Sequence, residues 1–125
     1  MKRKTHTQKR ILIVDDDAMN LRRTALILVK HYEIVSVESG EAALYKLAEE
    51  KFDLILLDIA MPGMSGLETF ERMKEKKIET PVIFLTASGY EDDVMSAIKL
   101  GAVNYLKKPF MPNDLLARVE KELDQ

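Results

Sequence analysis

Four short runs of mainly apolar residues in this chain each end in side chains that can carry chemistry. Runs of this length, separated by stretches with helical periodicity, are typical of strands buried on both faces of a parallel sheet. The four runs and the residues that follow them are Ile11–Val14 before Asp15, Asp16 and Asp17; Leu54–Leu57 before Asp58; Val82–Leu85 before Thr86; and Val103–Leu106 before Lys107, Lys108 and Pro109.

Strand-like and helical stretches alternate five times along the chain. This alternation predicts an α/β fold, a doubly wound five-stranded parallel sheet with right-handed crossovers and helices on both faces. Ser65 and Glu68 have the spacing of a capping box, and Asp17 is expected to cap the first helix. The expected strands cover 11–14, 33–37, 53–57, a run from 81 and a run ending at 108; the expected helices cover 18–30, 39–51, a stretch after Ser65, a stretch ended by Gly101 and a stretch from 112.

The domain organisation follows from length and charge. The whole chain has a net charge of −2. The first ten residues carry five basic and no acidic side chains, so the remaining residues carry a net charge of −7. We expect residues 1–9 to form a basic, disordered tail and residues 10–125 to form one domain. The tail is interpreted as a solvated arm or cloning remnant, with a weak nucleic-acid or partner contact as the alternative. The acidic body argues against nucleic acid as the main ligand.

Composition excludes several other classes of function. The chain has no cysteine, which excludes disulfides, thiolate zinc sites and cysteine nucleophiles and fits a reducing compartment. No apolar stretch approaches the ~20 residues of a membrane span, and the basic N-terminus lacks the apolar region of a signal peptide. We therefore expect a cytoplasmic protein with no membrane contact.

The polar residues that follow the strands are expected to meet. In open parallel sheets, ligands bind at the carboxyl ends of the strands. Carboxylates, a hydroxyl and a lysine should therefore gather at one edge of this sheet, and such a set suits a divalent cation and a phosphoryl group. Each residue alone has a simpler interpretation: Asp15 and Asp16 as helix caps, Asp58 as a turn residue and Lys108 as a surface charge.

Together, the motifs resemble the receiver domain of bacterial two-component response regulators, of the chemotaxis-regulator type. The resemblance covers roughly residues 10–123, and it implies a flavodoxin-like sheet of strand order 2-1-3-4-5 and a cis peptide bond between Lys108 and Pro109. The motifs that carry it are Ile11–Asp17, Asp58–Gly66, Leu85–Ala87 and Tyr105–Phe110.

The resemblance also implies a site. Asp58 is the expected phosphoacceptor, whose carboxylate attacks phosphorus and forms an acyl phosphate. Mg²⁺ is the expected cofactor, held by Asp16, Asp58 and the backbone carbonyl of Ala60, with Asp15 acting through water. Lys108 is expected to neutralise a phosphoryl oxygen. It is chosen over Lys107 because the family pattern places the functional lysine directly before proline, and adjacent strand residues point to opposite faces.

Two further residues are expected to report phosphorylation. In the family, a hydroxyl such as that of Thr86 bonds the phosphoryl group, and an aromatic residue such as Tyr105 then turns from an exposed to a buried position. The small Ala87 should leave the site open to a donor. Ala60 and Ser88, two residues beyond Asp58 and Thr86, are expected to tune the rate of dephosphorylation.

The function predicted from these residues is a phosphoacceptor switch and not an enzyme acting on a separate substrate. It would catalyse its own phosphorylation and dephosphorylation, taking the phosphoryl group from a sensor histidine kinase, a phosphotransfer protein or, slowly, acetyl phosphate. The altered surface of the fourth helix, fifth strand and fifth helix would control a downstream effector or a fused output domain.

Two alternatives from other classes remain open from the sequence. A Mg²⁺-dependent phosphohydrolase with an aspartyl-phosphate intermediate would need a second acid where this chain has Ala60. A receiver-like interaction module that is never phosphorylated would not need the complete acid set and Lys108.

One departure from the family bears on assembly. Many DNA-binding regulators dimerise through charged pairs on the fourth-helix to fifth-helix face. Here Asp93 and Asp114 would repel each other, and Asn104 stands where an acid would face Arg118. We therefore expect a monomer or a different, weak dimer, with no direct nucleic-acid binding by this domain.

Overall fold

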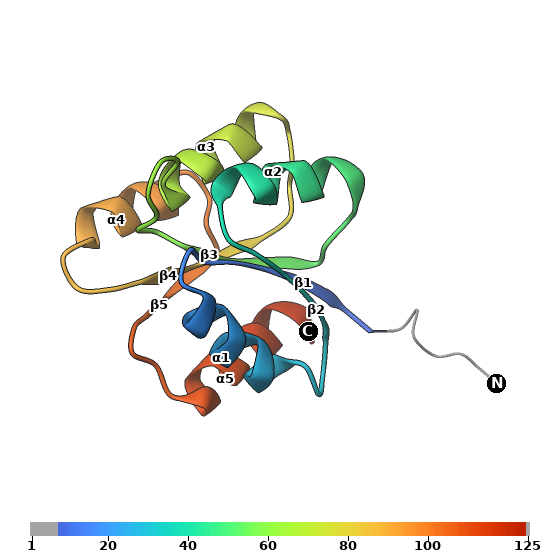
Figure 1. Ribbon diagram of the computed structural model, residues 1–125. Coiled ribbons are helices and arrows are strands. Elements are labelled where there is room, and N and C mark those ends of the chain that lie inside the picture. Colours follow the sequence, from blue (N-terminus) through green and yellow to red (C-terminus); the bar gives the residue numbers. More distant parts are fainter. Residues whose placement is uncertain (1–7, 125) are drawn as a thin grey trace.

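The computed structural model describes residues 8–124 and has the predicted doubly wound architecture (Figure 1). Five parallel strands are hydrogen-bonded in the order β2-β1-β3-β4-β5, which confirms the flavodoxin-like order implied by the family resemblance. The elements are β1 (Arg10–Val14), α1 (Ala18–Leu28), β2 (Glu33–Val37), α2 (Gly40–Glu49), β3 (Leu54–Asp58), α3 (Gly66–Glu75), β4 (Val82–Thr86), α4 (Glu91–Lys99), β5 (Asn104–Lys107) and α5 (Pro112–Leu123).

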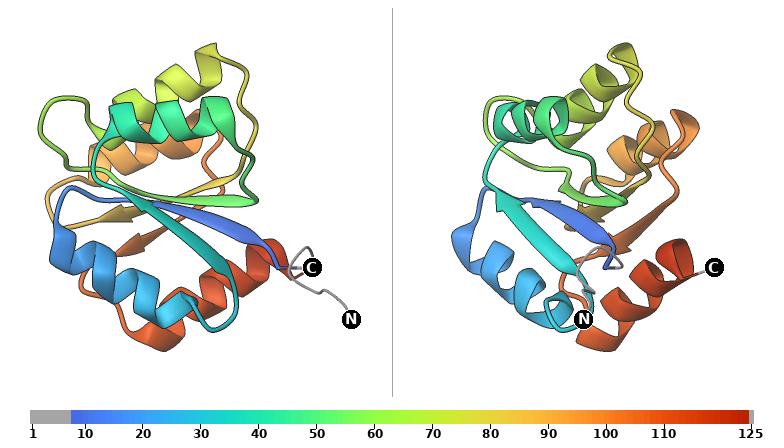
Figure 2. Two further views of the ribbon diagram at one scale, coloured as in Figure 1. Left: turned by 45° about the vertical axis from the view of Figure 1, so that its right-hand side comes forward. Right: turned by 90° about the vertical axis from the view of Figure 1, so that its right-hand side faces the viewer.

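Alternate residues of each central strand enter different cores. Leu12 and Val14 face the layer of α2, α3 and α4, whereas Ile11 and Ile13 face the layer of α1 and α5. Figures 1 and 2 show these two helical layers on opposite faces of the sheet. Because both faces of β1, β3 and β4 are covered, these strands are apolar except for Arg10, which begins β1, and for Asp58 and Thr86 at the carboxyl ends of β3 and β4.

Local signals set most of the helix ends. The Asp17 side chain accepts hydrogen bonds from the backbone amides of Met19 and Asn20, which confirms it as the cap of α1. Ser65 and Glu68 form the predicted capping box at the start of α3. Gly101, after α4, has a φ of 112°, a conformation that glycine adopts at little cost.

Some predicted boundaries were wrong by one or two residues. Helix α1 ends at Leu28 and not at residue 30, and Val29 is 52% exposed although it is apolar. Helix α2 ends at Glu49, and β3 runs one residue further than predicted, so that Asp58 belongs to the strand itself. Strand pairing with β4 extends through Asp58, opposite Leu85, and fixes the backbone of the candidate acceptor.

The basic tail predicted over residues 1–9 lies largely outside the described residues. Arg10 belongs to β1: its guanidinium binds Glu33 at 3.1 Å and Glu50 at 2.7 Å and lies 4.6 Å from the centre of the Phe52 ring. One of the five basic residues near the N-terminus is therefore paired within the domain.

Gly66 lies against the backbone of the candidate acceptor. A Cβ atom at this position would lie 2.1 Å from the backbone oxygen of Asp58, whereas a Cβ at Gly63 would have no atom within 4 Å. Because the obstacle at Gly66 is strand backbone and not a flexible side chain, Gly66→Ala is expected to lower the free energy of unfolding by about 3 kcal/mol. Urea denaturation would measure it.

Gly63→Ala is the matched control. It is expected to cost about 1 kcal/mol, for its positive φ of 73° alone. Equal effects of the two variants would show that the contact between Gly66 and β3 does not constrain the strand.

Candidate phosphoryl-acceptor and metal site

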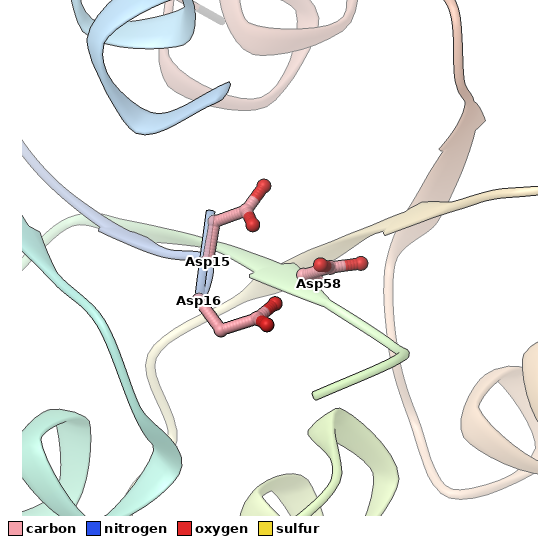
Figure 3. Close-up of side chains that lie close together, drawn as sticks. All are labelled: Asp15, Asp16 and Asp58. Atoms are coloured by element: carbon pink, nitrogen blue, oxygen red, sulfur yellow. The ribbon is translucent and has the colours of Figure 1, made fainter. Parts of the chain in front are cut away.

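The carboxyl ends of β1 and β3 bring three acidic side chains together. Asp15 and Asp16 directly follow β1, and Asp58 is the last residue of β3. One carboxylate oxygen from each lies within 4.8 Å of the others (Figure 3). The sequence predicted that these acids would meet at the ends of the strands. In the structure, Val14 pairs with Leu57 in the adjacent strand, and this pairing brings the residues that follow them together.

Both carboxylate oxygens of Asp15 have partners within the protein. Its side chain is buried, one oxygen accepts a hydrogen bond from the Asp17 amide at 2.9 Å, and the other lies 3.0 Å from the Lys108 ammonium. Asp16, in contrast, is exposed. This difference agrees with the expectation that Asp16 binds the metal directly and that Asp15 acts on it through water.

Lys108 completes the cluster from the β5–α5 loop. Its Nζ atom lies 3.3 Å from Asp58 as well as 3.0 Å from Asp15. The backbone amide of Lys108 donates to the Thr86 carbonyl at 2.7 Å, and the bond between Lys108 and Pro109 is cis, as the family resemblance implied. Lys107 is exposed and lines a different cavity, so the structure places the two lysines in separate environments.

Burial and charge oppose each other at Asp58. The pKa of its carboxyl is raised from 3.8 to about 6, because burial and the charge of Asp15 raise the pKa by more than Lys108 and a hydrogen bond from the Ala60 backbone lower it. For Lys108, burial lowers the pKa but the hydrogen bond to Asp15 and the charge of Asp58 outweigh it, so that the pKa is raised. The site thus holds three acids against one lysine.

The donor set fits a hard divalent cation. Clustered carboxylate oxygens are ligands of Mg²⁺ or Ca²⁺, and the excess of negative charge over Lys108 is what a bound dication would offset. Of the three acids, Asp15 has both oxygens held by protein donors, whereas Asp16 is exposed. The cluster can therefore hold a metal.

The cost of the buried charge gives a stability prediction. A raised acid pKa means that the folded protein holds the Asp58 proton more tightly than the unfolded chain, so ionised Asp58 destabilises the fold above about pH 6. Without metal near neutral pH, Asp58→Asn is expected to raise the free energy of unfolding by about 1–2 kcal/mol. The gain should shrink as the pH falls through about 6 towards 3.8.

Urea denaturation at several pH values would measure this gain. Asp17→Asn is the control, because Asn caps a helix as well as Asp does and residue 17 is exposed, so its change should stay within about 0.5 kcal/mol. A gain at Asp58 that does not vary with pH would contradict the assignment to buried charge.

Thr86 and Tyr105 border one cavity. Thr86 is buried and its hydroxyl donates to the Ala87 carbonyl at 3.1 Å. Tyr105, opposite Phe84 on the neighbouring strand, is 42% exposed. A cavity of about 170 Å³ lies between them, walled on the α4 side by Val94 and Met95, and we refer to it as the α4–β5 cavity.

Two features of the site were missed from the sequence. One is the contact of Gly66 with the Asp58 backbone. The other is a second cavity, lined on α1 by Asn20, Arg23 and Thr24, which share one helix face at spacings of three and four residues. That spacing of polar residues was the available signal.

The fold and the cluster define a class: a flavodoxin-like domain with acids and a lysine at the carboxyl edge of its sheet. The family model for the response regulator receiver domain matches residues 11–120. The chain belongs to this family of two-component signalling domains.

Relatives of known role agree with this placement. The chain is 40% identical to the transcriptional regulatory protein ResD of Bacillus subtilis, over 90% of this chain and 47% of ResD. It is 41% identical to the phosphate regulon transcriptional regulatory protein PhoB of Pseudomonas aeruginosa, over 92% and 52%. The chain thus spans about half the length of these relatives.

A solved structure agrees over almost the full length of both chains. The receiver domain protein (CheY-like) of Methanospirillum hungatei superposes with a TM-score of 0.88 at 34% identity, covering 94% of this chain and 95% of that one.

Within residues 8–124, no helix is long and apolar enough to cross a membrane.

Proposed function

We propose that this chain is a phosphorylation-dependent switch in which Asp58 accepts a phosphoryl group from a phosphohistidine donor in a Mg²⁺-dependent reaction. The observation that carries the proposal is the position of Asp58: buried, at the end of the central strand, 3.3 Å from Lys108 and beside Asp15 and Asp16. A carboxylate held among groups that balance charge is a suitable acceptor for a dianionic phosphoryl group.

Phosphoryl transfer to Asp58 would require only a few groups of the protein. A carboxylate oxygen of Asp58 attacks phosphorus, the bond from phosphorus to the donor imidazole nitrogen breaks, and its electron pair returns to the imidazole. Asp16, Asp58 and the Ala60 carbonyl would hold Mg²⁺, with Asp15 bound through water, and the bound ion would supply positive charge to the phosphoryl oxygens. Lys108 would bind a further phosphoryl oxygen, so that catalysis consists of alignment and charge stabilisation.

The readout passes through the α4–β5 cavity. A phosphoryl oxygen on Asp58 would accept a hydrogen bond from Thr86, which now donates to a backbone carbonyl. Movement of Thr86 would favour entry of the exposed Tyr105 ring into the space beside it. The surface of α4, β5 and α5 would change as a result.

The same site would return the switch to its resting state. Water attack on the aspartyl phosphate would restore the carboxylate, and Ala60 and Ser88, two residues beyond Asp58 and Thr86, would tune its rate. The chain would in this sense catalyse its own phosphorylation and dephosphorylation, without turning over a separate substrate.

The partners follow from the family. Receiver domains receive their phosphoryl groups from histidine kinases and act on fused output domains or separate effectors. We propose a sensor histidine kinase or phosphotransfer protein as the donor here, and an effector or fused output domain as the target, in the cytoplasm. Residues 10–125 would form the receiver domain, which itself binds no nucleic acid, after a basic tail.

We also propose a monomer or a weak dimer. Asp93 and Asp114 carry like charges on the face through which many regulators pair. Arg118 is occupied within its own chain, where it donates to Asn104 at 3.2 Å and to the Tyr105 carbonyl. Sedimentation velocity is expected to show a monomer at micromolar concentration, with or without a phosphoryl mimic; a stable dimer abolished by Arg118→Ala would contradict this.

Intact mass spectrometry after incubation with Mg²⁺ and acetyl phosphate tests the function. A gain of about 80 Da, absent when EDTA is added, would support the switch. Phosphate release in the same tube separates the other classes: rapid release with no lasting adduct would favour a phosphohydrolase, and neither adduct nor release would favour an interaction module that is never phosphorylated.

A further inference from the structure

A cavity of about 350 Å³ opens beside the acceptor site, between α1 and the segment that joins β5 to α5. Both elements lie on the same side of the sheet (Figure 1). We call it the α1 cavity. Its lining residues include Asn20, Arg23 and Thr24 from α1, and Ala87, Lys108 and Phe110 from the opposite wall.

Lys108 joins the α1 cavity to the acceptor. The same side chain that lines the cavity lies 3.3 Å from the Asp58 carboxylate. Ala87, which follows Thr86 at the end of β4, also lines the cavity and has a small side chain. A molecule whose phosphoryl group meets Asp58 and Lys108 can therefore extend its remaining atoms into this cavity.

Thr24 places a buried hydroxyl on the wall of the α1 cavity. Thr24 is only 3% exposed, and its hydroxyl makes no hydrogen bond to any residue between 8 and 124. A buried hydroxyl without a partner costs free energy and calls for a ligand or water. Asn20 and Arg23 share its helix face and add an amide and a guanidinium, so that the wall is rich in donors.

We propose that the α1 cavity binds the acyl group of a small acyl phosphate while Asp58 attacks its phosphorus; the inference rests on the proposed function. In this step the bond between Asp58 oxygen and phosphorus forms, and the bond from phosphorus to the acyl oxygen breaks. The electron pair leaves with the carboxylate product, and no proton is needed. Arg23 binds the carboxylate as its charge develops, and Thr24 and Asn20 donate to its oxygens.

Two phosphodonors that differ in their leaving group test the proposal. Acetyl phosphate releases a carboxylate, whereas phosphoramidate releases neutral ammonia, which offers Arg23 no anion. Initial rates of adduct formation with each donor are measured by intact mass at several donor concentrations, and their ratio is compared between variants. Arg23→Ala is expected to lower the ratio of acetyl phosphate to phosphoramidate kcat/KM about tenfold, the effect of one charged hydrogen bond.

Arg22→Ala is the matched control, because Arg22 neighbours Arg23 but does not line the α1 cavity; of the two cavities that Arg23 borders, Arg22 lines only the surface hollow with Met19 and Leu26. Thr24→Val is a second variant of nearly equal shape. It is expected to lower the same ratio about threefold. Its melting temperature, measured without donor or metal, should not fall, because the hydroxyl that it removes is unpaired.

The outcomes separate the two proposals. If neither donor gives an adduct on the unmodified protein, the proposed function fails. If both donors react but Arg23→Ala changes the ratio no more than Arg22→Ala does, the α1 cavity does not hold the acyl group. A marked loss of stability in Thr24→Val would show that the hydroxyl is satisfied in the free protein, and would also overturn the inference.

Discussion

Replacing Lys108 with alanine is expected to lower the rate of phosphorylation by acetyl phosphate roughly 10²–10³-fold. The Lys108 ammonium lies within 3.3 Å of the Asp58 carboxylate and is the one cation that the structure places against the cluster among residues 8–124. When Asp58 attacks, negative charge accumulates on the phosphoryl oxygens in a partly buried site, where a fixed positive charge is worth most. Initial rates of adduct formation at saturating Mg²⁺ measure the effect.

Lys107→Ala is the matched control for Lys108. Lys107 is adjacent in sequence and carries the same charge, but its side chain is exposed and lines the α4–β5 cavity. An exposed charge outside the site should alter the rate by less than about threefold. Equal losses in the two variants would show that general positive charge, and not the contact with Asp58, supports the reaction.

Replacing Asp16 with asparagine is expected to weaken Mg²⁺ binding at least tenfold and to slow phosphorylation at sub-saturating metal in proportion. Asp16 is the exposed acid of the cluster, whereas the neighbouring Asp15 has both of its oxygens bonded within the protein. Neutralising Asp16 therefore removes a ligand charge without leaving a buried partner unpaired. Calorimetric titration of the protein with Mg²⁺ measures the affinity, independently of any phosphoryl transfer.

Asp17→Asn serves as the control for Asp16→Asn. The two acids are neighbours with equal charge, but Asp17 is engaged in capping α1, a role that asparagine fills equally well. Its Mg²⁺ affinity should stay within about twofold of the unmodified protein. An Asp16→Asn variant that binds Mg²⁺ no more weakly than Asp17→Asn would contradict the assignment of Asp16 as a ligand.

The sequence predicted the structure best where a short local pattern is enough to determine the element, as in the buried strands and the helix caps. Apolar runs ending in Asp15, Asp58 and Thr86 could be predicted as buried strands because both faces of a central strand demand apolar residues, and polar residues can begin only at its end. Capping by Asp17 and the Ser65–Glu68 pair could be predicted for a similar reason, since caps depend on neighbours within one turn.

The features that the sequence left undetermined depend on contacts between distant segments. The bonds of Lys108 to Asp15 and Asp58 join residues that are far apart in the sequence, and no local pattern states which acid a lysine will approach. The close approach of Gly66 to the Asp58 backbone is likewise a tertiary contact. In the sequence, Thr24 is an ordinary polar residue of a helix, and only the folded structure shows that it is buried.

Locating the phosphoryl group tests directly whether Asp58 is the phosphoacceptor. The protein is treated with Mg²⁺ and acetyl phosphate, reduced with borohydride to convert an aspartyl phosphate into homoserine, digested and sequenced by mass spectrometry, with Asp58→Asn alongside. We expect conversion at Asp58 and none in the variant. Conversion at Asp15 or Asp16, or an adduct that persists in Asp58→Asn, would contradict the assignment of Asp58 as the phosphoacceptor.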